Sequence, residues 1–219
     1  MNPRELEASA EAIVVAGRRL GARGLIVATE GNLSVRLGDQ VLVTPSGRRK
    51  DELTTDDLLL VPADPEADPL DPDRPDRRPT SDLRIHRAVY AARPDVRAIA
   101  HAHLPASLAL TLAGEVPDPA GLPETSLFLP RLPFLPLMDP GSPELAGAIA
   151  AAFADGLEPP VHAVLLERHG AVAIGPSPDA AVDRLELVDL LCRVWRDARL
   201  LELARRLAFG PDRAIPPTG

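Results

Sequence analysis

Three histidines have the types and spacing of metal ligands. His101 and His103 lie two residues apart in the apolar segment VRAIAHAH, and alternate residues of an extended strand project from the same face of a sheet. His169 precedes Gly170 between two apolar runs, at a tight turn from which a side chain can point into a cleft. Three imidazoles with an open position are typical of a catalytic metal site. The His101–His103 spacing alone favours two unrelated core or surface histidines, so the prediction depends on His169.

Asp82 is the candidate for acid–base chemistry. It follows Thr80 and Ser81 in the first turn of an expected helix, and a carboxylate beside a metal site can shuttle a proton. An aspartate at this place is also a common helix cap. The sequence leaves both roles open.

Small polar and glycine residues occur in three short segments that offer backbone N–H or hydroxyl donors to an anion. Each segment taken singly is also an ordinary turn. The segments are Gly31-Asn32, Ser46-Gly47 and Thr80-Ser81.

Other polar residues have weaker signals. His86 lies one turn beyond Asp82 on the same helix face, and we expect it to pack or to donate a hydrogen bond behind the site. His162, beside two prolines, is expected to be exposed. Three residues of the irregular stretch could line the far end of the site: Glu124, Ser126 and Arg131.

The chain has one lysine and one cysteine. Lys50 lies in the polar segment GRRKDE, where we expect an exposed side chain and no Schiff-base chemistry, which needs a desolvated amine. Cys192 lies in an expected helix, where a single thiol usually packs in the core.

The elements that must position these residues alternate between helices and strands, which predicts a three-layer α/β/α sandwich. The pattern predicts a β-hairpin around Gly38, a strand ending at the H-x-H pair, and two strands joined near His169. Residues 126–129 and 132–138 are expected to be extended, and 62–79 to form a Pro/Asp-rich loop. Helices are expected at 3–22, from Thr80 or Ser81 as N-cap, at 105–114, at 143–155 and at 178–208.

Length and composition fit one domain, residues 1–219, with 45% apolar residues and a net charge of −8. This charge disfavours a nucleic-acid binder, which gathers cations on one face. The charged N-terminus lacks the apolar stretch of a signal peptide, and no apolar run has the length of a membrane span. We therefore expect a cytoplasmic protein that binds neither nucleic acid nor membrane.

Five motifs in order, GN, TPSG, PTSD, HAH and ERHG, resemble the class II aldolase/adducin family, which includes fuculose-phosphate aldolase and ribulose-phosphate 4-epimerase. The resemblance implies a single-domain fold with a mainly antiparallel central sheet, and a zinc ion held by His101, His103 and His169. Asp82 falls where the aldolases usually have a glutamate that serves as metal ligand and then base; the epimerase branch has Asp there. The resemblance places the substrate phosphate on the three polar segments: Gly31, Asn32, Ser46, Gly47, Thr80 and Ser81.

The resemblance implies a zinc-dependent, aldolase-type lyase that cleaves or forms a C–C bond in a phosphorylated ketose through an enediolate. The alternatives are a sugar-phosphate 4-epimerase, a dehydratase or decarboxylase of the same family, and a non-catalytic adducin-like interaction domain. Retention of all three histidines argues against the last. The family's later tyrosine is absent, since Tyr90 is the only one. The resemblance further implies a homo-tetramer.

Overall fold

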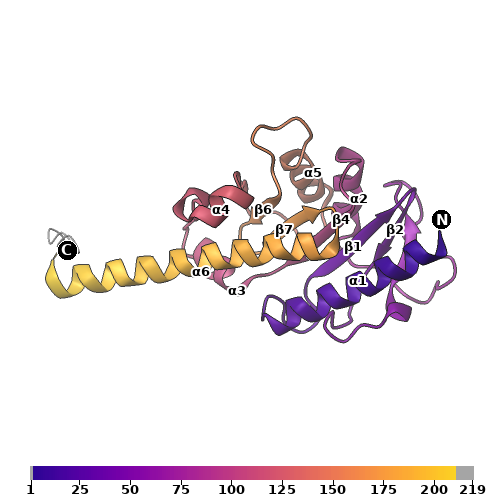
Figure 1. The fold of residues 1–219 in the computed structure, drawn as a ribbon, viewed down its shortest axis with the longest axis horizontal. Helices are drawn as coiled ribbons and strands as arrows, with labels where there is room; N and C mark the ends of the chain where they lie inside the picture. The colour runs from indigo at the N-terminus through magenta and orange to yellow at the C-terminus, as the bar shows by residue number, and fades with distance from the viewer. Residues whose placement is uncertain (1, 211–219) are drawn as a thin grey trace.

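The computed structural model describes residues 2–210 and has an α/β architecture (Figure 1). Seven strands form one mixed sheet in the order β3-β2-β1-β4-β7-β6-β5. Their bounds are β1 Asn32–Leu37, β2 Gln40–Val43, β3 Leu59–Pro62, β4 Ala98–Ala102, β5 Phe134–Leu135, β6 Ala163–Leu166 and β7 Gly170–Gly175. Within the described chain β5 alone pairs in parallel, and the other neighbours are antiparallel. The expected mainly antiparallel sheet is confirmed.

Helices cover both faces of this sheet and bury an apolar cluster on each. On one face lie α1 (Pro3–Ala22), α3 (Pro105–Leu112) and α6 (Pro178–Phe209), and on the other α2 (Leu83–Ala92) and α5 (Pro143–Ala152). Successive side chains of a strand point to opposite faces of the sheet. Alternate residues of each strand therefore belong to different clusters. The short helices are α4 (Pro123–Phe128), η1 (Thr55–Asp57) and η2 (Pro119–Gly121). The predicted three-layer arrangement is confirmed.

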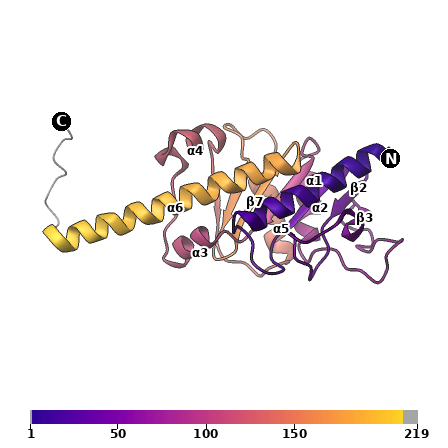
Figure 2. The same ribbon diagram turned by 60° about the horizontal axis from the view of Figure 1, so that its bottom comes forward.

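Helix α6 continues well beyond the sheet, as both views show (Figures 1 and 2). Ser177 caps its start by accepting a hydrogen bond from the backbone N–H of Ala180, and Pro178 occupies its first position, where the missing N–H costs nothing. Its buried residues end at Cys192. Beyond that point several large apolar side chains are exposed: Leu200, Leu201, Leu203, Leu207 and Phe209.

Two expectations about local structure are wrong. Helix α2 begins at Leu83, with Asp82 rather than Thr80 or Ser81 as N-cap, and the Asp82 side chain makes no capping hydrogen bond. Ser126–Phe128 belong to the helix α4 and are not extended. Pro123 at the first turn has the φ value of a helix, and this local signal prevails over the strand preference of Phe128.

The segment between β3 and α2 has no regular helix or strand from residue 63 to 78, as the Pro/Asp-rich composition predicts. The buried Arg87 anchors it, because its guanidinium donates hydrogen bonds to the carbonyl oxygens of Pro62, Ala67 and Asp68. None of the helices within residues 2–210 combines the length and the apolar character that crossing a membrane requires.

Candidate metal centre

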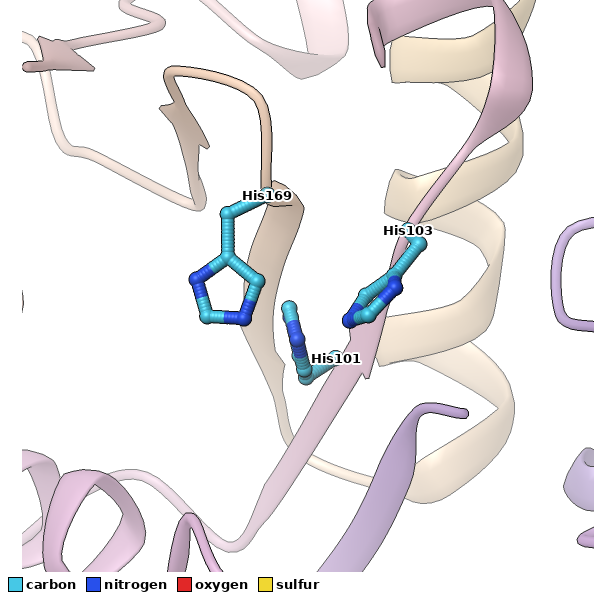
Figure 3. A group of neighbouring side chains, drawn as sticks. All are labelled: His101, His103 and His169. Atoms are coloured by element: carbon cyan, nitrogen blue, oxygen red, sulfur yellow. The ribbon is translucent and has the colours of Figure 1, made fainter. Parts of the chain in front are cut away.

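The three histidines expected from the sequence converge on one point. His101 comes from β4, His103 follows the end of that strand, and His169 lies in the turn between β6 and β7 (Figure 3). Their ring centroids are 4.9 to 5.2 Å apart. One ring nitrogen from each lies within 4.8 Å of the others. This spacing lets one ion contact all three, since zinc–nitrogen bonds are about 2.0–2.1 Å long.

His101 is oriented as a metal ligand. Its Nδ1 donates to the carbonyl oxygen of Ala171, 2.9 Å away, which leaves Nε2 as the atom with a free lone pair. This Nε2 is buried and is the one buried side-chain nitrogen or oxygen in residues 2–210 without a hydrogen-bond partner. A backbone carbonyl that fixes the tautomer of a histidine is the usual partner of a metal-binding imidazole. The donor set therefore fits a divalent metal.

Two glycines allow the strands to approach this closely. A Cβ at Gly170, whose φ is +99°, would lie 2.5 Å from the Cα of His103 and 2.2 Å from the oxygen of Ala102. A Cβ at Gly31, whose φ is +70°, would lie 2.8 Å from the oxygen of His101. Both backbone conformations favour glycine. These positions explain why glycines stand in the ERHG and GN motifs.

Burial favours the neutral form of His101 and His169, which is the state that binds metal. Desolvation lowers the pKa of His101 to about 3. Desolvation also lowers the pKa of His169, with a further contribution from the nearby His103. Removal from water disfavours the charged form of a histidine.

Asp82 lies beside the histidines. Its Oδ2 is 4.0 Å from His101 Nε2 and accepts a 2.8 Å hydrogen bond from Nδ2 of Asn32. Burial raises the pKa of this carboxyl, but His101 and the Asn32 hydrogen bond outweigh it and leave the pKa below its ordinary value. The side chain is therefore an ionised carboxylate directed at the cluster rather than at the helix end.

The three polar segments lie side by side. The backbone N–H of Ser46 donates to the oxygen of Arg78, and that of Thr80 donates to the oxygen of Thr44. Thr44 also bonds Leu33, next to Asn32, through both its N–H and its hydroxyl. Gly47, with φ +68°, has open space around it. Ser46, Gly47 and Ser81 are exposed, so their donors can reach a ligand. The amide of Asn32 is buried, its oxygen bonds His86 and one of its two N–H groups donates to Asp82.

Lys50 is not exposed, and that expectation is wrong. Its side chain is among the largest that are fully buried, and Nζ donates to the carbonyl oxygens of Thr29 and Arg48 at 2.7 and 2.6 Å. Desolvation lowers its pKa to about 8, against the opposing influence of Asp82. The ammonium thus ties the segment before Gly31 to the turn after Gly47.

Sequence reasoning missed two residues. Glu30 places Oε1 3.2 Å from Nδ1 of His103, and Ser34 bonds His86. The sequence does contain an indication of the position of Ser34. It lies two residues from Asn32 in a strand, and therefore on the same face of the sheet. His86 itself is buried and hydrogen-bonded behind the site, as expected.

Of the three residues expected at the far end of the site, Glu124 lines a cavity that lies apart from the histidines. This cavity, of about 460 Å³, lies between α1, α4 and α6 and is also lined by residues such as Arg23 and Asp189. None of the three histidines lines this cavity. A second cavity, of about 390 Å³, is lined by Thr80 and Ser81 and by three arginines: Arg78, Arg84 and Arg87.

Comparison with known families gives one match that covers most of the chain. The model of the "Class II Aldolase and Adducin N-terminal domain" matches residues 11–196. A solved structure, L-fuculose-1-phosphate aldolase from Thermus thermophilus, is similar with a TM-score of 0.75 and 28% identity, covering 93% of this chain and 97% of that one.

Three curated relatives differ in the reaction that their names state. The 5-methylthioribulose-1-phosphate/5-deoxyribulose-1-phosphate aldolase of Rhodospirillum rubrum is 30% identical, over 87% of this chain and 81% of its own. The methylthioribulose-1-phosphate dehydratase of Acidiphilium cryptum is 34% identical, over 85% and 89%. The 3-oxo-tetronate 4-phosphate decarboxylase of Cupriavidus necator is 31% identical, over 84% and 82%.

Proposed function

This chain belongs to the class II aldolase and adducin family, and we propose that it is a zinc-dependent lyase that cleaves or forms a C–C bond in a phosphorylated ketose. The observation that carries the proposal is the convergence of three imidazoles, one with a buried Nε2 that has no partner within residues 2–210, beside an ionised carboxylate. His101, His103 and His169 hold the metal, and imidazole donors suit zinc.

The bound metal supplies Lewis-acid stabilisation of the negative charge that develops next to the substrate carbonyl. The protein supplies the rest. Asp82 takes the proton of the substrate hydroxyl as the C–C bond breaks, and returns a proton to the carbon that becomes a carbanion. Its lowered pKa supports the ionised form that accepts the proton first.

The phosphate is held at the polar segments. Gly31, Gly47 and Ser81 offer backbone or hydroxyl donors, and Ser46 and Thr80 add hydroxyls. The packing of segment 44–46 against 78–80 supports this assignment. Arg78 and Arg84, which line the cavity next to Thr80 and Ser81, supply positive charge close to the anion.

Metal analysis tests the metal site. We expect about one zinc-like ion per chain in the wild type and loss of the ion in the His101→Ala/His103→Ala double variant. His162→Ala is the matched control, because His162 is absent from the histidine cluster. Wild-type metal content in the double variant would reject the site.

Product analysis tests the reaction. The zinc-loaded protein is incubated with 5-deoxyribulose 1-phosphate, the substrate type that the Rhodospirillum relative's name states. We expect an aldehyde and dihydroxyacetone phosphate. No cleavage of this or other phosphorylated ketoses would exclude the aldolase assignment.

The second candidate is a dehydratase, favoured by the 34% identity to the Acidiphilium relative. It would use the same metal and the same proton-accepting carboxylate, but water rather than an aldehyde would leave. Methylthioribulose 1-phosphate distinguishes the two, because dehydration gives one product that keeps all the carbons of the substrate.

We also propose that the chain acts as a homo-tetramer, as the family resemblance implies. The exposed apolar side chains of α6 beyond Cys192 support association, since extended apolar surface in a protein usually marks an interface. The histidine cluster includes two side chains that are only half-buried, which leaves room for a neighbouring subunit to complete the site.

A further inference from the structure

A chain of four hydrogen bonds leads away from Asp82 into the protein. Nδ2 of Asn32 lies 2.8 Å from Asp82, and Oδ1 of Asn32 lies 2.6 Å from Nε2 of His86. Nδ1 of His86 lies 2.6 Å from Oγ of Ser34, which lies 2.8 Å from the hydroxyl of Tyr90. Asn32, Ser34, His86 and Tyr90 are each at most 2% exposed. Water therefore does not compete for these bonds.

The hydrogens of this network have one consistent arrangement. The ionised Asp82 can only accept, so the amide nitrogen of Asn32 faces it and the amide oxygen faces His86. His86 must then carry its hydrogen on Nε2, which leaves Nδ1 to accept from Ser34. Because the Ser34 hydrogen is directed at His86, the single hydroxyl hydrogen of Tyr90 is directed at Ser34, 2.8 Å away, rather than at the carbonyl oxygen of Arg97, 3.4 Å away. Every donor points toward Asp82.

The network connects the sheet to the helix that carries Asp82. Asn32 and Ser34 lie two apart on one face of β1, and Asn32 pairs directly with His101 of β4. His86 and Tyr90 lie four apart on one face of α2, whose N-cap is Asp82. The same residues thus fix the carboxylate relative to the strand that carries the first histidine.

We propose that His86 is a positioning residue: through Asn32 it holds the Asp82 carboxylate at the three-histidine site. Asn32 is the link, because its amide oxygen bonds His86 and one N–H of its amide nitrogen donates to Asp82. Ser34 and Tyr90 hold the His86 tautomer. The effect on turnover rests on the proposed function, whereas the placement of the carboxylate does not.

Two substitutions at His86 test the effect on turnover of 5-deoxyribulose 1-phosphate. His86→Leu removes the donor, and His86→Gln offers an amide N–H at about the place of Nε2. We expect His86→Leu to lower kcat by about 10–100-fold, as for loss of a group that orients a site residue, with KM changed less than about 3-fold. His86→Gln should restore most of kcat, and the control His162→Gln should match the wild type. A rise in KM alone, or equal losses in both His86 variants, would overturn the proposal.

His86→Leu combined with Asp82→Asn distinguishes a positioning role of His86 from a general disturbance of the structure. If His86 acts through Asp82, His86→Leu should cause little further loss of kcat in the Asp82→Asn protein. An undiminished further loss would mean that His86 supports turnover by another route, and the proposal would fail.

Two measurements do not depend on turnover, so they distinguish failure of this proposal from failure of the proposed reaction. In nitrogen-15 NMR spectra of the metal-free protein, the His86 signal, identified by its loss in His86→Gln, should show the neutral tautomer with hydrogen on Nε2. A crystal structure of His86→Leu should show the Asp82 carboxylate turned away from Asn32 and His101. The opposite tautomer, or an unmoved carboxylate in a folded His86→Leu protein, would overturn the proposal.

Discussion

Gly170 and His103 approach each other so closely that a Cβ on Gly170 would lie 2.5 Å from the Cα of His103. Gly170→Ala should therefore push β7 from β4, separate His169 from the other two histidines and weaken metal binding. Backbone strain at φ +99° should itself cost about 1–3 kcal/mol of stability. Metal content and denaturant unfolding measure the two effects.

The matched control for this prediction is Gly114→Ala. Gly114 also has a positive φ, +76°, but nothing lies within 4 Å of its added Cβ. The Gly114→Ala protein should lose some stability and keep its metal. If both variants keep their metal, the close packing of Gly170 does not shape the site.

Asp82→Asn should keep the fold and the metal, because an amide has nearly the same shape and the histidines remain. Turnover should fall by roughly 10²–10⁴-fold, the usual cost of losing a general acid–base group. The Asp82 side chain makes no capping hydrogen bond and accepts one from Asn32, so an almost wild-type rate would leave it only a structural role. Steady-state kinetics together with metal analysis decide between these outcomes.

Substitutions at Ser46 and Ser81 should weaken the binding of a phosphorylated substrate much more than that of its unphosphorylated analogue. Replacing both with aspartate puts negative charge and bulk at the proposed anion site, and KM for the phosphorylated ketose should rise far more than KM for the unphosphorylated one. The paired measurement on both substrates is the check. Equal changes for the two would mean that these serines only shape turns.

Lys50 should make stability depend on pH above neutrality. Its pKa is 10.5 in an unfolded chain and about 8 in the folded one, so between these values the unfolded chain binds more protons and the free energy of unfolding rises with pH. Burial raises the pKa of Cys192 to about 12, which opposes this rise from about pH 9. The contribution of Lys50 is therefore isolated by subtracting the values of Lys50→Met.

The experiment is denaturant unfolding of wild type and Lys50→Met between pH 7 and 10.5, with chelator present. The wild type should gain stability relative to the variant as pH rises from 8 to 10.5. A constant difference would mean that the ammonium is not desolvated in the folded chain.

Light scattering at micromolar concentration should give about four times the chain mass of 23.3 kDa. Replacing Leu201 and Leu207, which are 72% and 79% exposed, with lysine should reduce the mass without unfolding the chain. A monomeric wild type would contradict the homo-tetramer.

The sheet and the histidine cluster could be predicted from the sequence because their signals are local. Strand alternation places His101 and His103 on one face, and a glycine after His169 indicates the tight turn. The surroundings of Lys50 could not be predicted in this way. Its neighbours in the chain are polar, and its burial comes from contacts with Thr29, which is distant in sequence.

The roles of Asp82 and Asn32 also depended on distant contacts. A capping aspartate and a turn asparagine were reasonable interpretations of each residue taken singly. Only the packing of α2 on β1 brings the amide of Asn32 between Asp82 and His86, and no short window of sequence contains that pairing. The extended structure expected at Ser126–Phe128 was wrong because a helix begins at Pro123 and includes these residues.

In a hydrogen-exchange experiment, the amides in the buried part of helix α6 can serve as a reference for the amides in its exposed part. Its backbone hydrogen bonds are of one kind throughout, but its buried residues end at Cys192. Amides before that point should exchange only when the core opens, whereas those from Leu200 onward should exchange by fraying of the helix end. A covering subunit would slow the second group and leave the first almost unchanged. The ratio of the two rates, followed against protein concentration, therefore reports where along the helix another chain binds.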